Sequence, residues 1–291
     1  MPIEQVKVLG IRLDILRKKD ALSIIRAVLG GSSGQCHVAT VNAEFVMESL
    51  NRERFKKILD QTYLNLADGI GPIWAAKYLS IRLKSRGVVR VFMAIWQMIY
   101  SGASLLFWPN YVRQIIPDRI GGIDTMLDIC RMAESYGKKV FLLGGSLVDP
   151  STPRKTEIEL CRLYPKLEFK HLDGPVLTLE GEYNQDENDK VIDEIVDFSP
   201  EVLFVAFSHP KAQYWIEDNL KDISTVKIAI GVGGSFEFIG KSIKRAPIIL
   251  RYLGVEWLWR LILQPKRLPR IFTATVRFIS AVVKSKINLI R

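Results

Sequence analysis

The sequence predicts an α/β fold with a mainly parallel sheet that is covered by helices on both faces, a Rossmann-like arrangement. Segments with helical periodicity alternate with short apolar runs from residue 20 to residue 234. Several of these runs, such as 201–207 (EVLFVAF), are apolar throughout, which is typical of strands buried on both sides. Ligands of such sheets bind beyond the carboxyl ends of the strands.

Local signals place each element in order. The helix at 20–29 begins at Asp20, an N-cap residue type, and the strand at 36–42 is the apolar run CHVATVN. The strand at 63–69 leads into a turn at Asp68-Gly69, and the strand at 139–146 ends in two glycines. Periodicity predicts further helices at 44–59, 71–79, 123–136, 153–163, 187–197 and 211–220, and further strands at 167–172, 201–207 and 226–234.

The net charge of +10 is concentrated in two segments. Residues 245–291 hold ten basic residues against the single acid Glu256, and residues 80–119 hold six against Asp118. We therefore divide the chain into an α/β domain, 1–245, with an insertion at about 82–115, and a basic amphipathic appendage, 246–291.

Bulky apolar residues, including Trp257, Trp259 and Phe272, separate the basic residues of the appendage. This pattern is typical of an interfacial helix on an anionic membrane surface, whereas nucleic-acid segments interleave their charges with polar residues. We therefore expect membrane contact and no nucleic-acid partner. The alternative is a core-packed helix whose basic face is only solvated.

Residues 91–112 contain no charged side chain, which is long enough for a transmembrane helix. Ser101-Gly102 in the centre, Pro109 and positive charge on both flanks argue against a span. We expect a hydrophobic helical hairpin that enters one leaflet, or a contact in a homo-oligomer. Because no secretory signal precedes the body, we place the protein on the cytoplasmic face of the membrane, as a peripheral or monotopic protein.

Metal and dinucleotide signatures are missing from the sequence. The three cysteines form no C-x-x-C pair, the three histidines are scattered, and there is no D-x-D, so we expect no metal and no cofactor. Gly144-Gly145 lacks the G-x-G-x-x-G spacing, so a nucleotide-binding oxidoreductase remains only an alternative.

Polar residues and glycines follow five of the predicted strands. Glycine lets backbone N–H groups approach a phosphate, and a following helix N-terminus favours its negative charge. These strand-end residues are Thr40, Asn42, Asp68, Gly69, Gly144, Gly145, His209, Pro210, Lys211, Gly233 and Gly234.

Several segments, which occur in the same order along the chain, resemble the WecG/TagA/CpsF family of bacterial glycosyltransferases, glycosyltransferase family 26. They include TVNAEFV (40–46), LADGIGPIWAAKYL (66–79), RIGGID (119–124), HPKAQYWIEDN (209–219), IGVGGSFEFIGKSIKRAP (230–247) and GVEWLWRLILQPKRLPR (254–270). The resemblance implies an inverting, metal-independent enzyme. Such an enzyme moves a hexose or N-acetylhexosamine, of N-acetylmannosamine type, from a UDP-sugar to a polyprenyl-diphosphate-linked sugar in cell-surface polysaccharide synthesis.

The resemblance also implies roles for individual residues. Asp68 matches the family's general base, and Thr40 and Asn42 match the residues that orient substrate beside it. The residues matched to substrate binding, above all to the diphosphate, are Arg119, Arg260, Arg267, Arg270, Lys211, Gln213 and Glu237. Two positions depart from the family: Ala212 stands at its glutamine, and Glu237 at its aspartate. A catalytically altered, membrane-associated interaction protein is therefore a second alternative.

Overall fold

The computed structural model describes residues 3–31, 34–145, 149–248, 250 and 256–288. The strands are β1 (Gln5–Val8), β2 (Ile11–Asp14), β3 (Cys36–Val41), β4 (Leu64–Ala67), β5 (Val140–Leu143), β6 (Phe169–Leu172), β7 (Val202–Val205) and β8 (Ile228–Gly231). The helices before residue 120 are α1 (Lys18–Leu29), α2 (Ala43–Ser49), α3 (Glu53–Gln61), α4 (Ile70–Ser80), α5 (Gly87–Phe107) and α6 (Pro109–Val112). They are followed by α7 (Gly122–Ser135), α8 (Thr152–Leu163), α9 (Gln185–Phe198), α10 (Lys211–Asn219) with the 3-10 turn η1 (Leu220–Asp222), and α11 (Ser235–Ile239).

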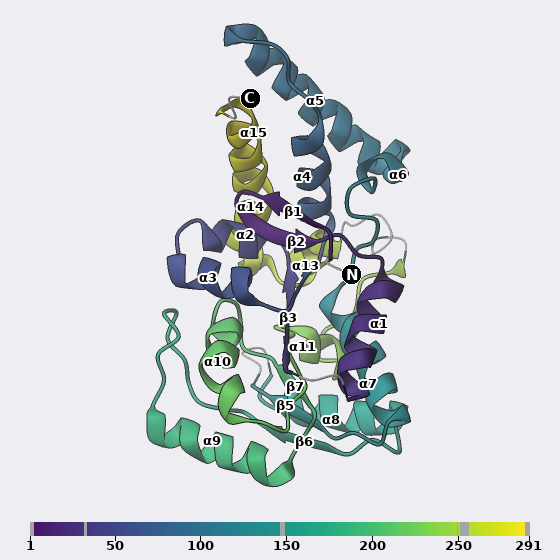
Figure 1. The fold of residues 1–291 in the computed structure, drawn as a ribbon, viewed down its shortest axis with the longest axis vertical. Helices are drawn as coiled ribbons and strands as arrows, with labels where there is room; N and C mark the ends of the chain where they lie inside the picture. Colours follow the sequence, from purple (N-terminus) through teal and green to yellow (C-terminus); the bar gives the residue numbers. More distant parts are fainter. Residues whose placement is uncertain (1–2, 32–33, 146–148, 249, 251–255, 289–291) are drawn as a thin grey trace.

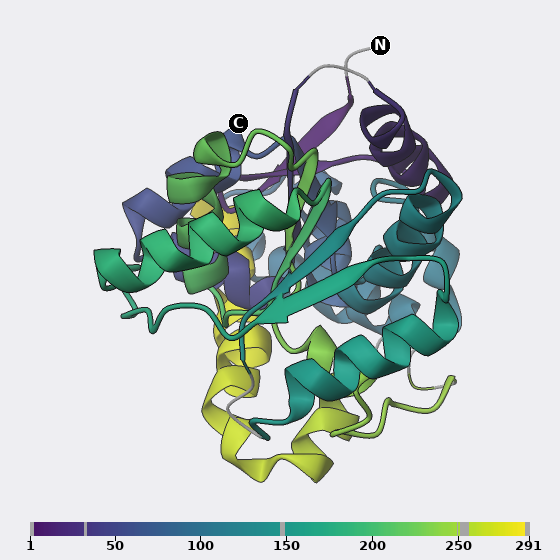
Figure 2. The same ribbon diagram turned by 90° about the horizontal axis from the view of Figure 1, so that it is seen from below.

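Six parallel strands form the central sheet in the order β4-β3-β8-β7-β5-β6, as the sequence predicts (Figures 1 and 2). Side chains alternate between its two faces because a strand has a period of two. Val38 and Ile230 pack with α1, α7, α8 and α11 on one face, whereas Ala39 and Ala229 pack with helices on the other. The predicted α/β class is confirmed.

The first two strands form a hairpin that the sequence analysis did not predict. β1 and β2 pair antiparallel through the two-residue turn Leu9-Gly10, in which both φ angles are positive. Such turns match the twist of a hairpin but favour glycine or asparagine, so a leucine in the first position hides the signal.

The predicted helix at 44–59 is two helices, α2 and α3, which is a correction. α2 ends at Ser49, whose hydroxyl donates to the Val46 carbonyl at 2.7 Å. Serine and asparagine side chains compete with the helical backbone for hydrogen bonds, and Asn51 follows in the break.

The insertion is one continuous helix, α5, and not a hairpin that breaks at Ser101-Gly102. The helix continues because this stretch packs on α4, where Trp74 Nε1 donates to Ser101 Oγ at 3.0 Å. The chain turns later, at Trp108-Pro109, where proline cannot donate a helical hydrogen bond. Figure 1 shows α5 crossing one end of the molecule, far from α9.

The basic appendage packs into the body. It comprises α13 (Glu256–Leu263), the 3-10 turn η2 (Pro265–Arg267), α14 (Leu268–Phe272), the π-helical turn η3 (Thr273–Arg277) and α15 (Phe278–Asn288). Phe278 and Val282 of α15 are buried in the same core as α2 and α4. The boundary at residue 246 stays a prediction, and Arg251 and Arg291 of the predicted basic segment lie outside the described residues.

Candidate active site

The carboxyl ends of the strands bring the predicted polar residues to one edge of the sheet. Asp68 directly follows β4, Asn42 follows β3, and the Gly233-Gly234 pair lies two residues beyond the end of β8. β3 lies between β4 and β8 in the sheet, so these three strand ends are neighbours. This is the edge at which open parallel sheets bind ligands.

Asp68 lies in a confined and charged environment. Its carboxylate accepts a hydrogen bond from the backbone N–H of Gly122, the first residue of α7. A β-carbon on Gly121 would lie only 3.3 Å from Asp68 Oδ1, so the backbone before α7 passes directly beside the carboxylate. Burial raises the pKa of Asp68 to about 6, partly opposed by the positive charge of Arg119.

Two further charges from the appendage act on Asp68. The negative charge of Glu256 raises its pKa, and the positive charge of Arg260 lowers it. Glu256 Oε2 also lies 3.5 Å from Arg119 Nη1. The first helix of the appendage therefore contributes charge to the surroundings of the predicted base.

Thr40 lies near the end of β3, the strand beside β4, and Asn42 directly follows β3. Thr40 is 6% exposed, and its Oγ1 would lie 3.5 Å from a β-carbon on Gly122. Asn42 Oδ1 accepts from Phe45 N at 3.0 Å, so Asn42 is the N-cap of α2. The structure thus places Thr40 beside the start of α7 and gives Asn42 a capping contact that the sequence analysis did not predict.

The predicted arginines 260 and 267 meet at the end of β8. Arg260 Nη2 would lie 3.1 Å from a β-carbon on Gly234, and its guanidinium lies 4.6 Å above the ring of Phe238. Arg267 Nη2 lies 3.5 Å from Glu237 Oε2. Burial lowers the pKa of Arg267, and the positive charge of Arg260 lowers it further. Guanidinium groups bind anionic oxygens through paired N–H donors, so two arginines near one strand end suit an anionic ligand.

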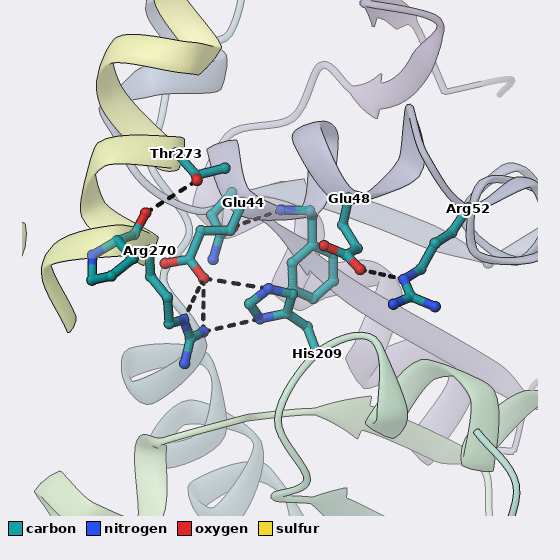
Figure 3. A network of polar contacts seen from close by, with 9 residues as sticks. Glu44, Glu48, Arg52, His209, Arg270 and Thr273 are labelled. Carbon is teal, nitrogen blue, oxygen red and sulfur yellow. Dashed lines mark hydrogen bonds and ion pairs between the residues drawn. The ribbon is translucent and has the colours of Figure 1, made fainter. Parts of the chain in front are cut away.

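Arg270 lies in a second cluster, with Glu44 of α2 and His209 before α10 (Figure 3). Arg270 Nη2 lies 2.7 Å from Glu44 Oε2 and 3.2 Å from His209 Nδ1. Burial lowers the pKa of His209, which favours the neutral ring. Glu44 was not predicted as a site residue, although it belongs to the quoted segment TVNAEFV. His209 was among the predicted strand-end residues but was given no role in substrate binding or catalysis.

Other predicted residues do not join these clusters. Gln213 is fully buried, with Oε1 2.5 Å from His37 Nε2, because its position on α10 faces the sheet. Lys211 Nζ donates to the Leu177 carbonyl at 2.5 Å. Pro210, which directly precedes α10, is buried.

The glycines after β5 have separate environments. A β-carbon on Gly144 would lie 3.2 Å from the Ala206 backbone carbon, so this glycine permits close packing between neighbouring strand ends. Gly145 is exposed, near Asp173.

The described residues contain no group of three His, Cys, Asp or Glu side chains that could hold a metal ion. The expectation of a reaction without metal or cofactor stays a prediction. Diphosphate binding by Arg119, Arg260 and Arg267 stays a prediction.

A parallel α/β sheet with a carboxylate of raised pKa and several arginines near its strand ends suits the class of enzymes that act on anionic, phosphate-bearing substrates. The comparison with known proteins makes this specific. The model of the glycosyl transferase WecG/TagA/CpsF family matches residues 6–94 and 88–291, and the chain belongs to this family. The two matched segments meet within α5.

Characterised relatives match along nearly the whole chain. The N-acetylglucosaminyldiphosphoundecaprenol N-acetyl-beta-D-mannosaminyltransferase of Staphylococcus aureus (strain MRSA252) is 26% identical over 283 residues, which cover 97% of this chain and 93% of the relative. The protein of the same name from strain NCTC 8325 / PS 47 has the same identity and coverage. The predicted glycosyltransferase activity is confirmed.

Proposed function

We propose that this glycosyltransferase moves a hexose or N-acetylhexosamine, of N-acetylmannosamine type, from a UDP-sugar to a polyprenyl-diphosphate-linked sugar. The product is a precursor of a cell-surface polysaccharide. The names of the relatives support this donor sugar and this acceptor. The observation that carries the proposal is Asp68, a carboxylate at a strand end whose pKa burial raises to about 6.

In the proposed reaction Asp68 is the general base. Its carboxylate takes the proton from the acceptor hydroxyl as that oxygen attacks the anomeric carbon of the donor. The bond between the anomeric carbon and the diphosphate breaks on the opposite face, so the sugar is inverted and UDP leaves with the electron pair. One base suffices for this single displacement, whereas a retaining mechanism needs a second carboxyl group as nucleophile.

Arg119, Arg260 and Arg267 stabilise the departing diphosphate in this proposal. Guanidinium groups bind phosphate oxygens through paired N–H donors, and preorganised charge of this kind lowers the transition-state energy. Thr40 and Asn42 orient the acceptor beside Asp68. Lys211, Gln213, Gly144 and Gly145 stay predictions as binding residues.

We further propose that the enzyme acts at the cytoplasmic face of the membrane as a monotopic protein. Of the described helices, α5 alone has the length and apolarity to cross a bilayer. Asp68 precedes α5 in the chain and Arg119 follows it, yet the charge of Arg119 acts on Asp68. A single span through α5 would place these two residues on opposite sides of the bilayer.

The contacts of α5 support a helix that lies along the membrane surface. Ala94, Ser101 and Ser104 are buried against the body, and Arg90 donates to the Ile287 and Lys286 carbonyls of α15 at 2.7 and 3.0 Å. The opposite face exposes large apolar side chains: Val88, Val89, Phe92, Trp96, Ile99, Leu106, Phe107 and Trp108. Apolar side chains exposed on one side only are typical of interfacial helices. A homo-oligomer stays a prediction.

Measuring UDP release with and without a lipid-linked acceptor tests the proposed reaction. The wild type should release UDP from UDP-N-acetylmannosamine only when the acceptor is present, and Asp68→Asn should lose at least about 10²-fold of that rate. Asp60→Asn, a carboxylate change on the exposed side of α3, is the matched control and should keep it. Full activity in Asp68→Asn would remove the base assignment, and no UDP release from any hexose donor would remove the proposed reaction.

A further inference from the structure

A basic groove lies at the end of α5, outside the candidate active site. It has a volume of about 810 Å³ and is lined by Arg17, Lys18 and Lys19 from the start of α1 and by Asn110 and Arg113 from α6 and its C-cap. We call it the α1–α6 groove. Asp118 faces this groove, whereas the next residue, Arg119, faces Glu256 and Asp68. The groove and the proposed catalytic site therefore lie on opposite sides of the same short segment.

The groove carries positive charge that its own acids do not neutralise. The acids that line the groove are Asp118 and Asp128: Asp118 Oδ2 accepts from the backbone N–H of Lys18 at 2.8 Å, and Asp128 Oδ2 lies 2.6 Å from Lys18 Nζ. No described residue forms an ion pair with Arg17 or Lys19, and both are exposed. Four basic side chains thus line the groove against two acids, and neither Arg17 nor Lys19 forms an ion pair among the described residues.

The apolar end of α5 leads directly into the segment that lines the groove. Phe107 and Trp108 are 78% and 66% exposed, and Trp108 directly precedes α6, which supplies Asn110 to the groove. Aromatic side chains prefer the boundary between the acyl chains and the headgroups, and lysine and arginine bind the lipid phosphates just outside it. In this arrangement a phosphate held in the groove would lie next to acyl chains against Phe107.

We propose that the α1–α6 groove binds the phosphate group of a membrane lipid and thereby sets the depth and orientation of α5 in the membrane surface. This inference rests on the membrane association proposed above. Phosphate is the ligand chemistry because Arg17 and Lys19 offer N–H donors and positive charge toward the groove, and the side-chain amide of Asn110 adds a further N–H donor group. A lipid is its source because the exposed Trp108, at the apolar end of α5, is only two residues from Asn110 of the groove.

Vesicle flotation with the full-length protein tests the proposal. We compare vesicles of phosphatidylcholine alone with vesicles that also contain phosphatidylglycerol, using the double variant Arg17→Gln/Lys19→Gln. The matched control is Lys190→Gln/Lys221→Gln, which removes the same charge from exposed positions on α9 and η1. The groove variant should bind the anionic vesicles roughly 30-fold more weakly than wild type, and the control should stay within about threefold. Equal losses in the two variants would overturn the proposal, because they would show that only net charge matters.

A second arm distinguishes a lipid phosphate from a free one. Inorganic phosphate is titrated into the protein without vesicles and its binding is followed by calorimetry. If it binds wild type but not the groove variant, while vesicle binding is equal in both, the ligand is a free phosphate and the lipid assignment is wrong. All of these measurements omit sugar substrates. A wild type that releases no UDP but shows the expected difference in vesicle binding would therefore overturn only the proposed reaction.

Discussion

Arg270 of α14 donates from both Nε and Nη2 to a single oxygen of Glu44 on α2, at 3.0 and 2.7 Å. His209 completes the contact: its Nδ1 lies 3.2 Å from Arg270 Nη2, and its Nε2 lies 3.3 Å from Glu44 Oε2 (Figure 3). Because arginine can only donate, Nδ1 accepts and Nε2 donates, so the ring is neutral. This agrees with the direction in which burial shifts the pKa of His209. The contact joins the appendage to the sheet edge that carries Asp68.

Replacing Arg270 by lysine tests whether this contact supports catalysis. A lysine keeps the charge but cannot reproduce the two directed N–H donors, so Glu44 and His209 lose their shared partner. We expect kcat/KM for UDP release to fall roughly 10- to 100-fold, the range for losing a charged hydrogen bond. Arg277→Lys, an exposed change on the same appendage, should leave kcat/KM within about threefold of wild type. Equal activity of the two variants would contradict a role for Arg270.

Gly121→Ala tests the close approach of backbone and base. Gly121 has φ −81° and ψ 145°, which alanine adopts without strain, but the added β-carbon would lie 3.3 Å from Asp68 Oδ1. We expect unfolding free energy to change by less than about 1 kcal/mol and activity to fall at least roughly tenfold. Gly102→Ala is the control, because a β-carbon there meets nothing within 4 Å. Full activity in Gly121→Ala would mean that the space between Gly121 and the Asp68 carboxylate is not needed for catalysis.

Asp68→Asn should be more stable than the wild type at neutral pH. The pKa of Asp68 rises from 3.8 to about 6 on folding, so the unfolded chain releases this proton more readily and ionisation above pH 4 costs folding free energy. That cost is fully present above pH 6, where it amounts to about 1 to 3 kcal/mol, and it disappears below pH 4. Thermal unfolding at pH 8 and at pH 4 measures the effect. A variant that is equally stable or less stable at pH 8 would contradict the raised pKa.

Much of the candidate site is predictable because it follows from chain direction. Parallel strands end at one edge, so Asp68, Asn42 and Gly234 could be placed together once the strands were recognised. The side-chain direction of Gln213 could not be predicted in this way. It lies one residue beyond Ala212 on a helix whose inner face is set only by packing, and that packing turns it toward His37.

The sequence also did not allow us to predict that α5 is one continuous helix. A serine and a glycine in the middle of an apolar segment are common at a break, and only the contact with Trp74 shows why the helix continues. The effect of Glu256 on the pKa of Asp68 is an electrostatic interaction between residues nearly 190 positions apart, and local periodicity carries no signal for it.

Charged substitutions on the outer face of α5 test membrane binding without disturbing the fold. Deleting the helix would expose Trp74 and Tyr78, which it covers, so Phe92→Glu/Trp96→Glu is a sharper change. These two side chains are 69% and 64% exposed. We expect the membrane-bound fraction in cell extracts to fall several-fold, because carboxylates oppose both apolar insertion and anionic lipids. Val176→Glu, at a position 84% exposed in the loop before α9, should have no effect. An unchanged membrane fraction in the α5 variant would mean that α5 does not contact lipid.

The pH dependence of kcat/KM should shift when the charged neighbours of Asp68 are removed, in opposite directions for Arg119 and Glu256. A general base works only when deprotonated, so kcat/KM should fall as the pH drops through about 6. Arg119→Gln removes the charge that most lowers the pKa of Asp68, so the acid limb of the profile should move to higher pH. Glu256→Gln removes a charge that raises this pKa, so the limb should move to lower pH. Asp60→Asn should leave the limb in place. The test compares only the pH at which the acid limb falls, so it holds even if Arg119→Gln also weakens substrate binding. Shifts in the same direction in both variants would show that another group is the base.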